Sequence, residues 1–313
     1  MLSGCGRRPL GLEARCRWST SAPHPVTDDP GRWHLHRRVV TTSVGPVVVH
    51  HRPGSDPLLL LHGVAGSWTT WTPFLTAAEG IGDRGLVLVD LPGWGSSPAP
   101  VVPLDTDGSG TVLTEVLDAL GVGEVDVVGH SMGAFVAMHL AVVAPDRVRS
   151  VALVSGTTVA TVRAARHPVR ALRTLPAFTL LRAGIRVTGS MASPLLRAAA
   201  RLGLLPVLAS PVFSHVRRLD PSVLRAFVDE FRPRGFLGAA RAAAAYDTEG
   251  WRAVTCPVTA VAGADDVFAR RSDLAALRQL VPWARTVLLD DCGHFAHVEH
   301  PAAVARTLGL VAA

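Results

Sequence analysis

The stretch that decides the fold of this chain is VDVVGHSMG, residues 125–133. Its first four residues are mostly apolar and predict a buried strand, and the apolar run from Ala134 to Val143 predicts a helix directly after it. Between them lies a Gly-x-Ser-x-Gly pattern centred on Ser131. This pattern builds a turn so tight that glycine is needed at both ends, and it holds the serine hydroxyl clear of the backbone. Because a strand and a helix flank it, the pattern predicts a nucleophilic serine rather than a chance match among 29 glycines.

Two side chains downstream of the serine complete a candidate catalytic set. A serine hydroxyl is a weak nucleophile until a base takes its proton and a third group orients that base. Asp266 follows the apolar run at residues 256–262, and His294 follows a second apolar run at residues 286–289. Each comes just past the end of a predicted strand, on the rim where Ser131 is expected. The order serine, acid, histidine is the one that goes with this kind of serine turn.

With these residues in place, the chain resembles the α/β-hydrolase superfamily from about residue 39 to its C-terminus. The resemblance implies an α/β fold with a mostly parallel eight-stranded sheet flanked by helices and an inserted helical cap. It also implies that Asp266 is the acid rather than the adjacent Asp265, because the family's acid turn reads Gly-x-x-Asp. The motifs that carry it stand in the family's order: the His-Gly loop within residues 58–67, the Asp-x-Pro-Gly-x-Gly-x-Ser turn from residue 90, the acid turn at 263–266, the Gly-His turn at 293–294 and the Glu-x-Pro start of the last helix at 299–301.

The chain divides into three predicted parts. Residues 38–156 and 251–313 alternate between strand-like and helix-like runs and predict the α/β-hydrolase core. Between residues 157 and 250 this alternation stops, and runs rich in Ala, Leu and Arg are broken by seven prolines. The family carries its helical cap at this place. Residues 1–37 lack apolar periodicity and predict a disordered N-terminal arm.

Composition narrows the class of protein. The chain has 313 residues and a net charge of +6, and it contains no Lys, so its basic side chains are all Arg. A basic chain can indicate a nucleic-acid partner. Here the skew is typical of a biased genome and no aromatic residues interleave the basic ones, so we expect no nucleic-acid partner. Four cysteines lack metal-site spacing, and no run reaches the ~18 apolar residues of a membrane span, which predicts a cytoplasmic protein.

The predicted cap at residues 157–250 is the most basic part of the chain. It has 14 Arg against 5 acidic residues, a net charge of +9. An ordinary solvated helix surface in an Arg-rich chain explains this, and we favour that explanation. Attraction of an anionic substrate or a lipid surface, as a peripheral membrane contact, is the alternative. The Leu and Phe residues of the segment predict packing on the core and an apolar substrate pocket.

The three histidines His294, His297 and His300 have a spacing that could suit metal ligands. Gly293 and Pro301 indicate a turn that enters a helix, and no Cys or carboxylate set completes a metal shell. We therefore expect no metal. The chain also lacks a Gly-x-Gly-x-x-Gly element, and we expect no organic cofactor.

The predicted site needs donors for an oxyanion and a wall for the substrate. The resemblance assigns the oxyanion to the backbone N–H groups of Val64, after the His-Gly loop, and of Met132, after the serine. Trp68 and Trp94 are candidates for the pocket wall, although packing is the default for such large rings.

The expected activity is that of a serine hydrolase of the esterase or lipase kind, which cleaves a carboxylic ester of a small, largely apolar substrate through an acyl-enzyme. The same triad serves cofactor-free haloperoxidases (perhydrolases), C–C bond hydrolases and acyltransferases, and these alternatives stay open. A dehalogenase or an epoxide hydrolase would need an Asp nucleophile where this chain has Ser131. The non-enzyme alternative is a ligand-binding module with an inactive triad.

Overall fold

The structure, a computed structural model, describes residues 14–16, 24–78, 81–101 and 104–311. Among these residues, nine strands form one sheet in the order β1-β9-β8-β7-β6-β4-β5-β3-β2. Strand β3 is antiparallel to both β2 and β5, and all other neighbours are parallel. The predicted α/β fold and its mostly parallel sheet are therefore confirmed. The strands are β1 (Ala14–Cys16), β2 (His36–Thr42), β3 (Gly45–Arg52), β4 (Ser55–Leu61), β5 (Arg84–Val89), β6 (Val125–His130), β7 (Val148–Val154), β8 (Val258–Gly263) and β9 (Arg285–Leu289).

The ninth strand comes from the N-terminal arm. The eight strands from β2 onward match the eight that the sequence predicts, and β1 adds to the outer edge of β9 by parallel pairing. Further along the arm, Pro30–Trp33 form the short helix η1, and the N–H of Val26 donates to Ser222. The structure thus differs from the expectation of a disordered arm at residues 14–16 and 24–37. A three-residue strand that pairs through its backbone leaves no apolar periodicity to read. Residues 1–13 and 17–23 lie outside the described residues.

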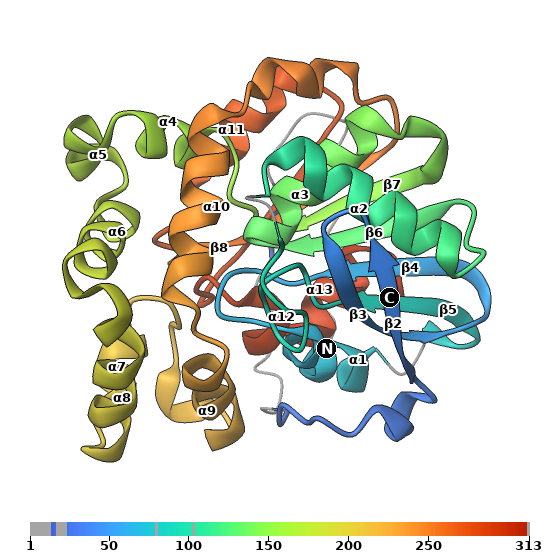
Figure 1. Cartoon of the computed structure of the whole chain (residues 1–313). Helices are drawn as coiled ribbons and strands as arrows, with labels where there is room; N and C mark the ends of the chain where they lie inside the picture. The colour runs from blue at the N-terminus through green and yellow to red at the C-terminus, as the bar shows by residue number, and fades with distance from the viewer. Residues whose placement is uncertain (1–13, 17–23, 79–80, 102–103, 312–313) are drawn as a thin grey trace.

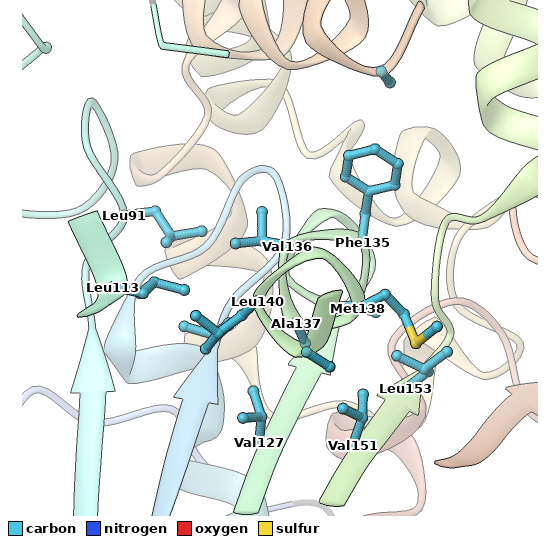
Figure 2. Packing of buried hydrophobic residues seen from close by; sticks show 14 of the residues in the cluster. Leu91, Leu113, Val127, Phe135, Val136, Ala137, Met138, Leu140, Val151 and Leu153 are labelled. Atoms are coloured by element: carbon cyan, nitrogen blue, oxygen red, sulfur yellow. The ribbon is translucent and has the colours of Figure 1, made fainter. Parts of the chain in front are cut away.

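Helices cover both faces of the sheet. One face carries α2 (Thr106–Ala119), α3 (Met132–Val143) and α11 (Arg271–Leu280), and the other carries η2 (Trp68–Trp71), α1 (Thr72–Ala77), α12 (Ala296–Glu299) and α13 (Pro301–Thr307). Alternate residues of β4 enter the two opposite cores, which is why this strand is an unbroken apolar run. Figure 2 shows Val127 of β6 and Val151 of β7 pointing toward α3. The short helices η4 (Pro145–Arg147) and η7 (Thr248–Ala253) complete the core.

Residues 157–250, which we call the cap, are helical. Proline occupies the first position of four of the cap helices, because its fixed φ suits that position and it has no N–H to satisfy. Four of the seven prolines that interrupt the sequence pattern therefore mark helix starts. Figure 1 shows α10 against the core and α5 to α8 farther from the sheet. The helices are α4 (Val159–Arg166), α5 (Pro168–Thr174), α6 (Pro176–Thr188), η5 (Gly189–Met191), α7 (Ala192–Arg201), α8 (Leu205–Ala209), η6 (Val216–Arg218), α9 (Pro221–Asp229) and α10 (Pro233–Ala245).

Among the described residues, no helix combines the length and the apolar character that crossing a bilayer requires.

Candidate active site

Ser131 sits in a strained turn between β6 and α3. Its backbone has φ 52° and ψ −115°, a left-handed conformation that costs a non-glycine residue about 1–3 kcal/mol. The turn needs glycine on both sides of the serine. A Cβ on Gly129 would lie 2.3 Å from the carbonyl oxygen of Gly133, and a Cβ on Gly133 would lie 2.2 Å from that of Leu61. The sheet, the turn and α3 therefore approach each other as closely as backbones can, and this holds the serine at the end of the strand.

Three side chains from three different strand ends meet at this turn. Nε2 of His294 lies 2.9 Å from Oγ of Ser131, and Nδ1 of the same ring lies 2.9 Å from Oδ2 of Asp266. All three are buried. Oδ1 of Asp266 accepts hydrogen bonds from the N–H groups of Phe268 and Ala269. These bonds hold the carboxylate in place beside the imidazole. The arrangement can move the serine proton to Nε2 and hold the resulting imidazolium with the carboxylate.

The histidine turn is fastened to the cap by a buried carboxylate. The N–H of His294 donates to the carbonyl of Val212. Glu299 accepts the N–H of Gly293 with one oxygen and the N–H of Ser214 with the other. Burial raises the pKa of Glu299 to about 7, against the lowering effect of these hydrogen bonds. The Glu-x-Pro motif thus positions His294, the candidate base, and ties the residue 212–214 segment of the cap to it.

His62 orients the His-Gly loop, which is the candidate oxyanion loop. The N–H of Leu91 donates to Nε2 of His62, which places the ring proton on Nδ1, and Nδ1 lies 2.8 Å from the carbonyl oxygen of Gly63. Because the N–H of Val64 belongs to the same trans peptide, it points the opposite way from that carbonyl. Burial lowers the pKa of His62 to about 4, so the ring is neutral at neutral pH and acts as a hydrogen-bonding group rather than a base.

Gly63→Ala should lower kcat for an ester by about 10²–10³-fold with little change in Tm, because the new methyl would push the oxyanion loop away from the serine. The added Cβ would lie 2.7 Å from Nδ1 of His130 and 2.8 Å from Cβ of Ser131. Gly123→Ala is the matched control, because a Cβ there meets nothing within 4 Å. Steady-state kinetics and thermal melts of both variants check this. Equal activity of the two would show that the loop does not serve the oxyanion.

A cavity of about 120 Å³ opens beside the serine hydroxyl. Among the described residues, the polar side chains that line it are those of Ser131, Thr157, Thr161 and His294, and no charged side chain lines it. Figure 2 shows the side chain of Phe135 pointing from α3 away from the strands. Phenylalanines from the core and the cap enclose the cavity: Phe135, Phe178, Phe227, Phe231, Phe236, Phe268 and Phe295.

A second, more open groove of about 740 Å³ shares Met132 and Phe135 with the cavity. Trp94 forms part of its wall, and the first turn of α10 lies against the indole, since a Cβ on Gly235 would be 2.9 Å from it. Three arginines of the cap also line the groove, namely Arg232, Arg234 and Arg241.

Trp68, the other tryptophan that the sequence suggested for the pocket wall, lies elsewhere. Its ring stacks on His50 at 4.2 Å between centroids, and it belongs to the core on the opposite face of the sheet from the cavity. The suggestion of a substrate contact is corrected here, since both the ring and its neighbours are buried. Sequence position near the His-Gly loop does not reveal on which face of the sheet a side chain falls.

The three histidines that could have suited a metal have separate surroundings. His294 belongs to the triad, His297 packs against Trp71 at 4.6 Å, and Nε2 of His300 lies 2.9 Å from the carbonyl oxygen of Asp291. Among the described residues, no three His, Cys, Asp or Glu side chains group as metal ligands.

Sequence reasoning missed His130, the residue before the serine. Its Nε2 lies 3.0 Å from the carbonyl oxygen of His294, and its ring touches the site of Gly63. The imidazole therefore joins the serine turn, the oxyanion loop and the histidine turn. Its position inside the Gly-x-Ser-x-Gly motif was visible in the sequence, but a bridging role depends on loops that are distant along the chain.

Comparisons with known proteins identify the family of the chain. A family model described as alpha/beta hydrolase fold matches residues 56–301. A 2-hydroxy-6-oxononadienedioate/2-hydroxy-6-oxononatrienedioate hydrolase of Cupriavidus pinatubonensis is 29% identical over 81% of this chain and 85% of its own length. A protein of the same name from Burkholderia vietnamiensis is 38% identical, but the match spans only 34% of this chain and 38% of that relative.

The solved structures give the same fold. An esterase from Exiguobacterium antarcticum has a TM-score of 0.69 at 16% identity, over 88% of this chain and 98% of the esterase. The match to the family model extends over most of the sequence, from the strand before the oxyanion loop to the start of the last helix. The chain belongs to the α/β-hydrolase fold family.

Proposed function

We propose that this chain is a serine esterase that cleaves carboxylic esters with a short, uncharged apolar acyl group. The observation that carries the proposal is the cavity of about 120 Å³ beside Oγ of Ser131, which no charged residue lines in the part of the chain that the structure describes. An acyl group there would lie next to the nucleophile, and a charged one would lose its hydration without gaining a partner.

The mechanism follows from the distances. Nε2 of His294, at 2.9 Å from Oγ, takes the proton of Ser131 as the oxygen attacks the ester carbonyl. The N–H groups of Met132 and Val64 stabilise the oxyanion. His294 then gives its proton to the leaving alcohol, and a water that it deprotonates hydrolyses the acyl-enzyme. Asp266 stabilises the imidazolium in both halves of the reaction.

The cavity volume sets the expected acyl length. An apolar protein cavity of about 150 Å³ holds one benzene ring, so a cavity of about 120 Å³ suits an acyl group of about four to six carbons. A panel of p-nitrophenyl esters from two to twelve carbons measures this through kcat/KM. An optimum in that range supports the proposal, and activity that rises steadily to the longest chains contradicts it.

Phe231→Ala should move the optimum toward longer acyl groups, because this half-buried ring closes part of the cavity and its removal leaves space for more methylenes. Trp283→Ala is the matched control: its exposed ring lies at the start of β9, on the opposite rim of the sheet. If Phe231→Ala is folded and its kcat/KM depends on acyl length as in the unmodified chain, this part of the cap does not form the acyl site.

A C–C bond hydrolase is the second candidate, and the likeness to a dienedioate hydrolase over 81% of the chain favours it. A dioate carries carboxylates, which the uncharged cavity does not suit, but Arg234 and Arg241 line the adjoining groove. Assays of 2-hydroxy-6-oxononadienedioate and of a neutral ester, carried out side by side, distinguish the two functions. A kcat/KM for the dioate above that for every ester would replace the esterase assignment.

A further inference from the structure

The outer side of the cap exposes an unusual amount of apolar surface. Of the fifteen large hydrophobic side chains exposed among the described residues, eleven lie within residues 169–208, which we call the cap outer face. Several are far more exposed than packing requires, with Val187 at 88% and Leu202 at 74%. The eleven are Val169, Leu172, Leu180, Leu181, Val187, Met191, Leu195, Leu202, Leu204, Val207 and Leu208.

The same face is basic and has no compensating acid. Residues 150–219, which include this face, contain ten Arg and neither Asp nor Glu. Five arginines of the cap outer face are exposed, and among the described residues none of their guanidinium groups makes an ion pair or a hydrogen bond: Arg170, Arg173, Arg186, Arg197 and Arg201. Arg182, beside them, has its pKa lowered first by burial and then by the charges of Arg186 and Arg241.

Arginines of the core behave differently. Arg147 pairs with Asp118, and Arg149 pairs with Asp56 and Glu124. A genome-wide preference for Arg explains why no Lys is present. It does not explain why acids pair with these arginines of the core and are missing from residues 150–219, 70 consecutive residues that include the cap outer face.

The face is joined to the active site through α6. Phe178 on this helix is buried and lines the acyl cavity, Leu181 also lines it but is 37% exposed, and Leu180 is 62% exposed. Figure 1 shows α6, α7 and α8 on the side of the cap that points away from the sheet. One helix thus has the cavity on one side and the cap outer face on the other.

We propose that the cap outer face docks on the surface of an anionic lipid bilayer. Helices that carry Leu and Val together with Arg, and no acids, have the composition of segments that lie in a membrane interface. The leucines would enter the boundary between headgroups and acyl chains, and each arginine near an anionic surface contributes about 1 kcal/mol. Docking in this orientation would bring the mouth of the cavity at Leu181 to the lipid, from which apolar esters partition.

A second copy of the chain is a poorer occupant of this face. In a symmetric dimer the same patch faces itself, so the unpaired arginines of one copy would lie against those of the other with no acid between them. A negatively charged lipid surface supplies the opposite charge and accepts scattered apolar side chains without a shaped groove.

Flotation with vesicles tests the proposal on the full chain. The protein should float with vesicles of phosphatidylcholine and phosphatidylglycerol at 7:3 and not with phosphatidylcholine alone, and the binding should fall when salt is raised from 0.1 to 1 M. The triple variant Arg186→Gln, Arg197→Gln and Arg201→Gln should raise the lipid concentration for half-binding by about 100-fold. The triple variant Leu195→Ser, Leu202→Ser and Val207→Ser should also lose binding at 0.1 M salt.

The control carries Arg38→Gln and Val39→Ser on β2, which are exposed at the far edge of the sheet, and it should bind like the unmodified chain. All variants should keep their Tm and their turnover of a soluble ester, so docking and hydrolysis are tested separately. Absence of flotation with anionic vesicles, or equal flotation of all variants, overturns the proposal. So does light scattering that shows a dimer which the apolar triple variant dissociates, since the face would then be an interface between copies.

Discussion

Ser131→Ala should lower kcat for the best ester of the panel by on the order of 10⁵–10⁶-fold, with the fold unchanged. In the proposed mechanism the hydroxyl oxygen is the atom that attacks, and no other hydroxyl lies within hydrogen-bond distance of Nε2 of His294 among the described residues. The oxyanion donors and the cavity stay in place, so some acceleration over water remains. Single-turnover rates and a thermal melt measure both parts of the prediction.

Ser131→Gly also removes the hydroxyl, and it tests the loss of activity in a variant that we expect to be more stable than the unmodified chain. Because Ser131 has φ 52°, glycine relieves backbone strain at this position, and the variant should be inactive yet melt at a higher temperature than the unmodified chain. A folded Ser131→Ala or Ser131→Gly variant that kept more than about a thousandth of the activity would show that another group is the nucleophile.

Asp266→Asn should lower kcat by about 10⁴-fold, with little effect on KM. Both carboxylate oxygens lie within 3.0 Å of Nδ1 of His294, and an amide that takes their place can donate to Nδ1 and stabilise the wrong tautomer. The proton then occupies Nε2, where the serine proton must go.

Asp265→Asn is the matched control, one residue away. Its side chain is exposed and accepts a hydrogen bond from the hydroxyl of Ser214, and its carboxylate makes no hydrogen bond with His294 among the described residues. The variant should retain nearly full activity. The opposite ranking of the two variants in steady-state kinetics would move the acid to Asp265.

The core strands could be predicted because the sequence signal of each lies within the strand itself. An unbroken apolar run such as residues 58–61 can be buried on both faces only inside a parallel sheet, and the run at 125–128 continues into a turn that only its two glycines permit. The strand at residues 14–16 could not be predicted. It pairs through backbone groups with β9, more than 260 residues away, and three residues carry no period.

The triad was easier to find in the sequence than the pocket. Ser131, Asp266 and His294 each stand at a strand end within a short motif, so their meeting follows from the parallel order of β6, β8 and β9. The phenylalanines of the cavity come from α3, from three cap helices and from three loops, and periodicity does not distinguish them from packing residues. The exposure of the cap outer face is likewise a property of how α5 to α8 pack, which composition alone does not give.

The central claim is that Ser131 is an activated nucleophile, and labelling with a fluorophosphonate probe tests it most directly. The geometry predicts one covalent adduct per chain, located by peptide mass spectrometry on the peptide that contains Ser131, and no adduct in Ser131→Ala. Prior treatment with an ester substrate should slow the labelling. An unlabelled, folded chain, or an adduct on a different residue, would contradict the claim and leave the site as a binding pocket on a hydrolase fold.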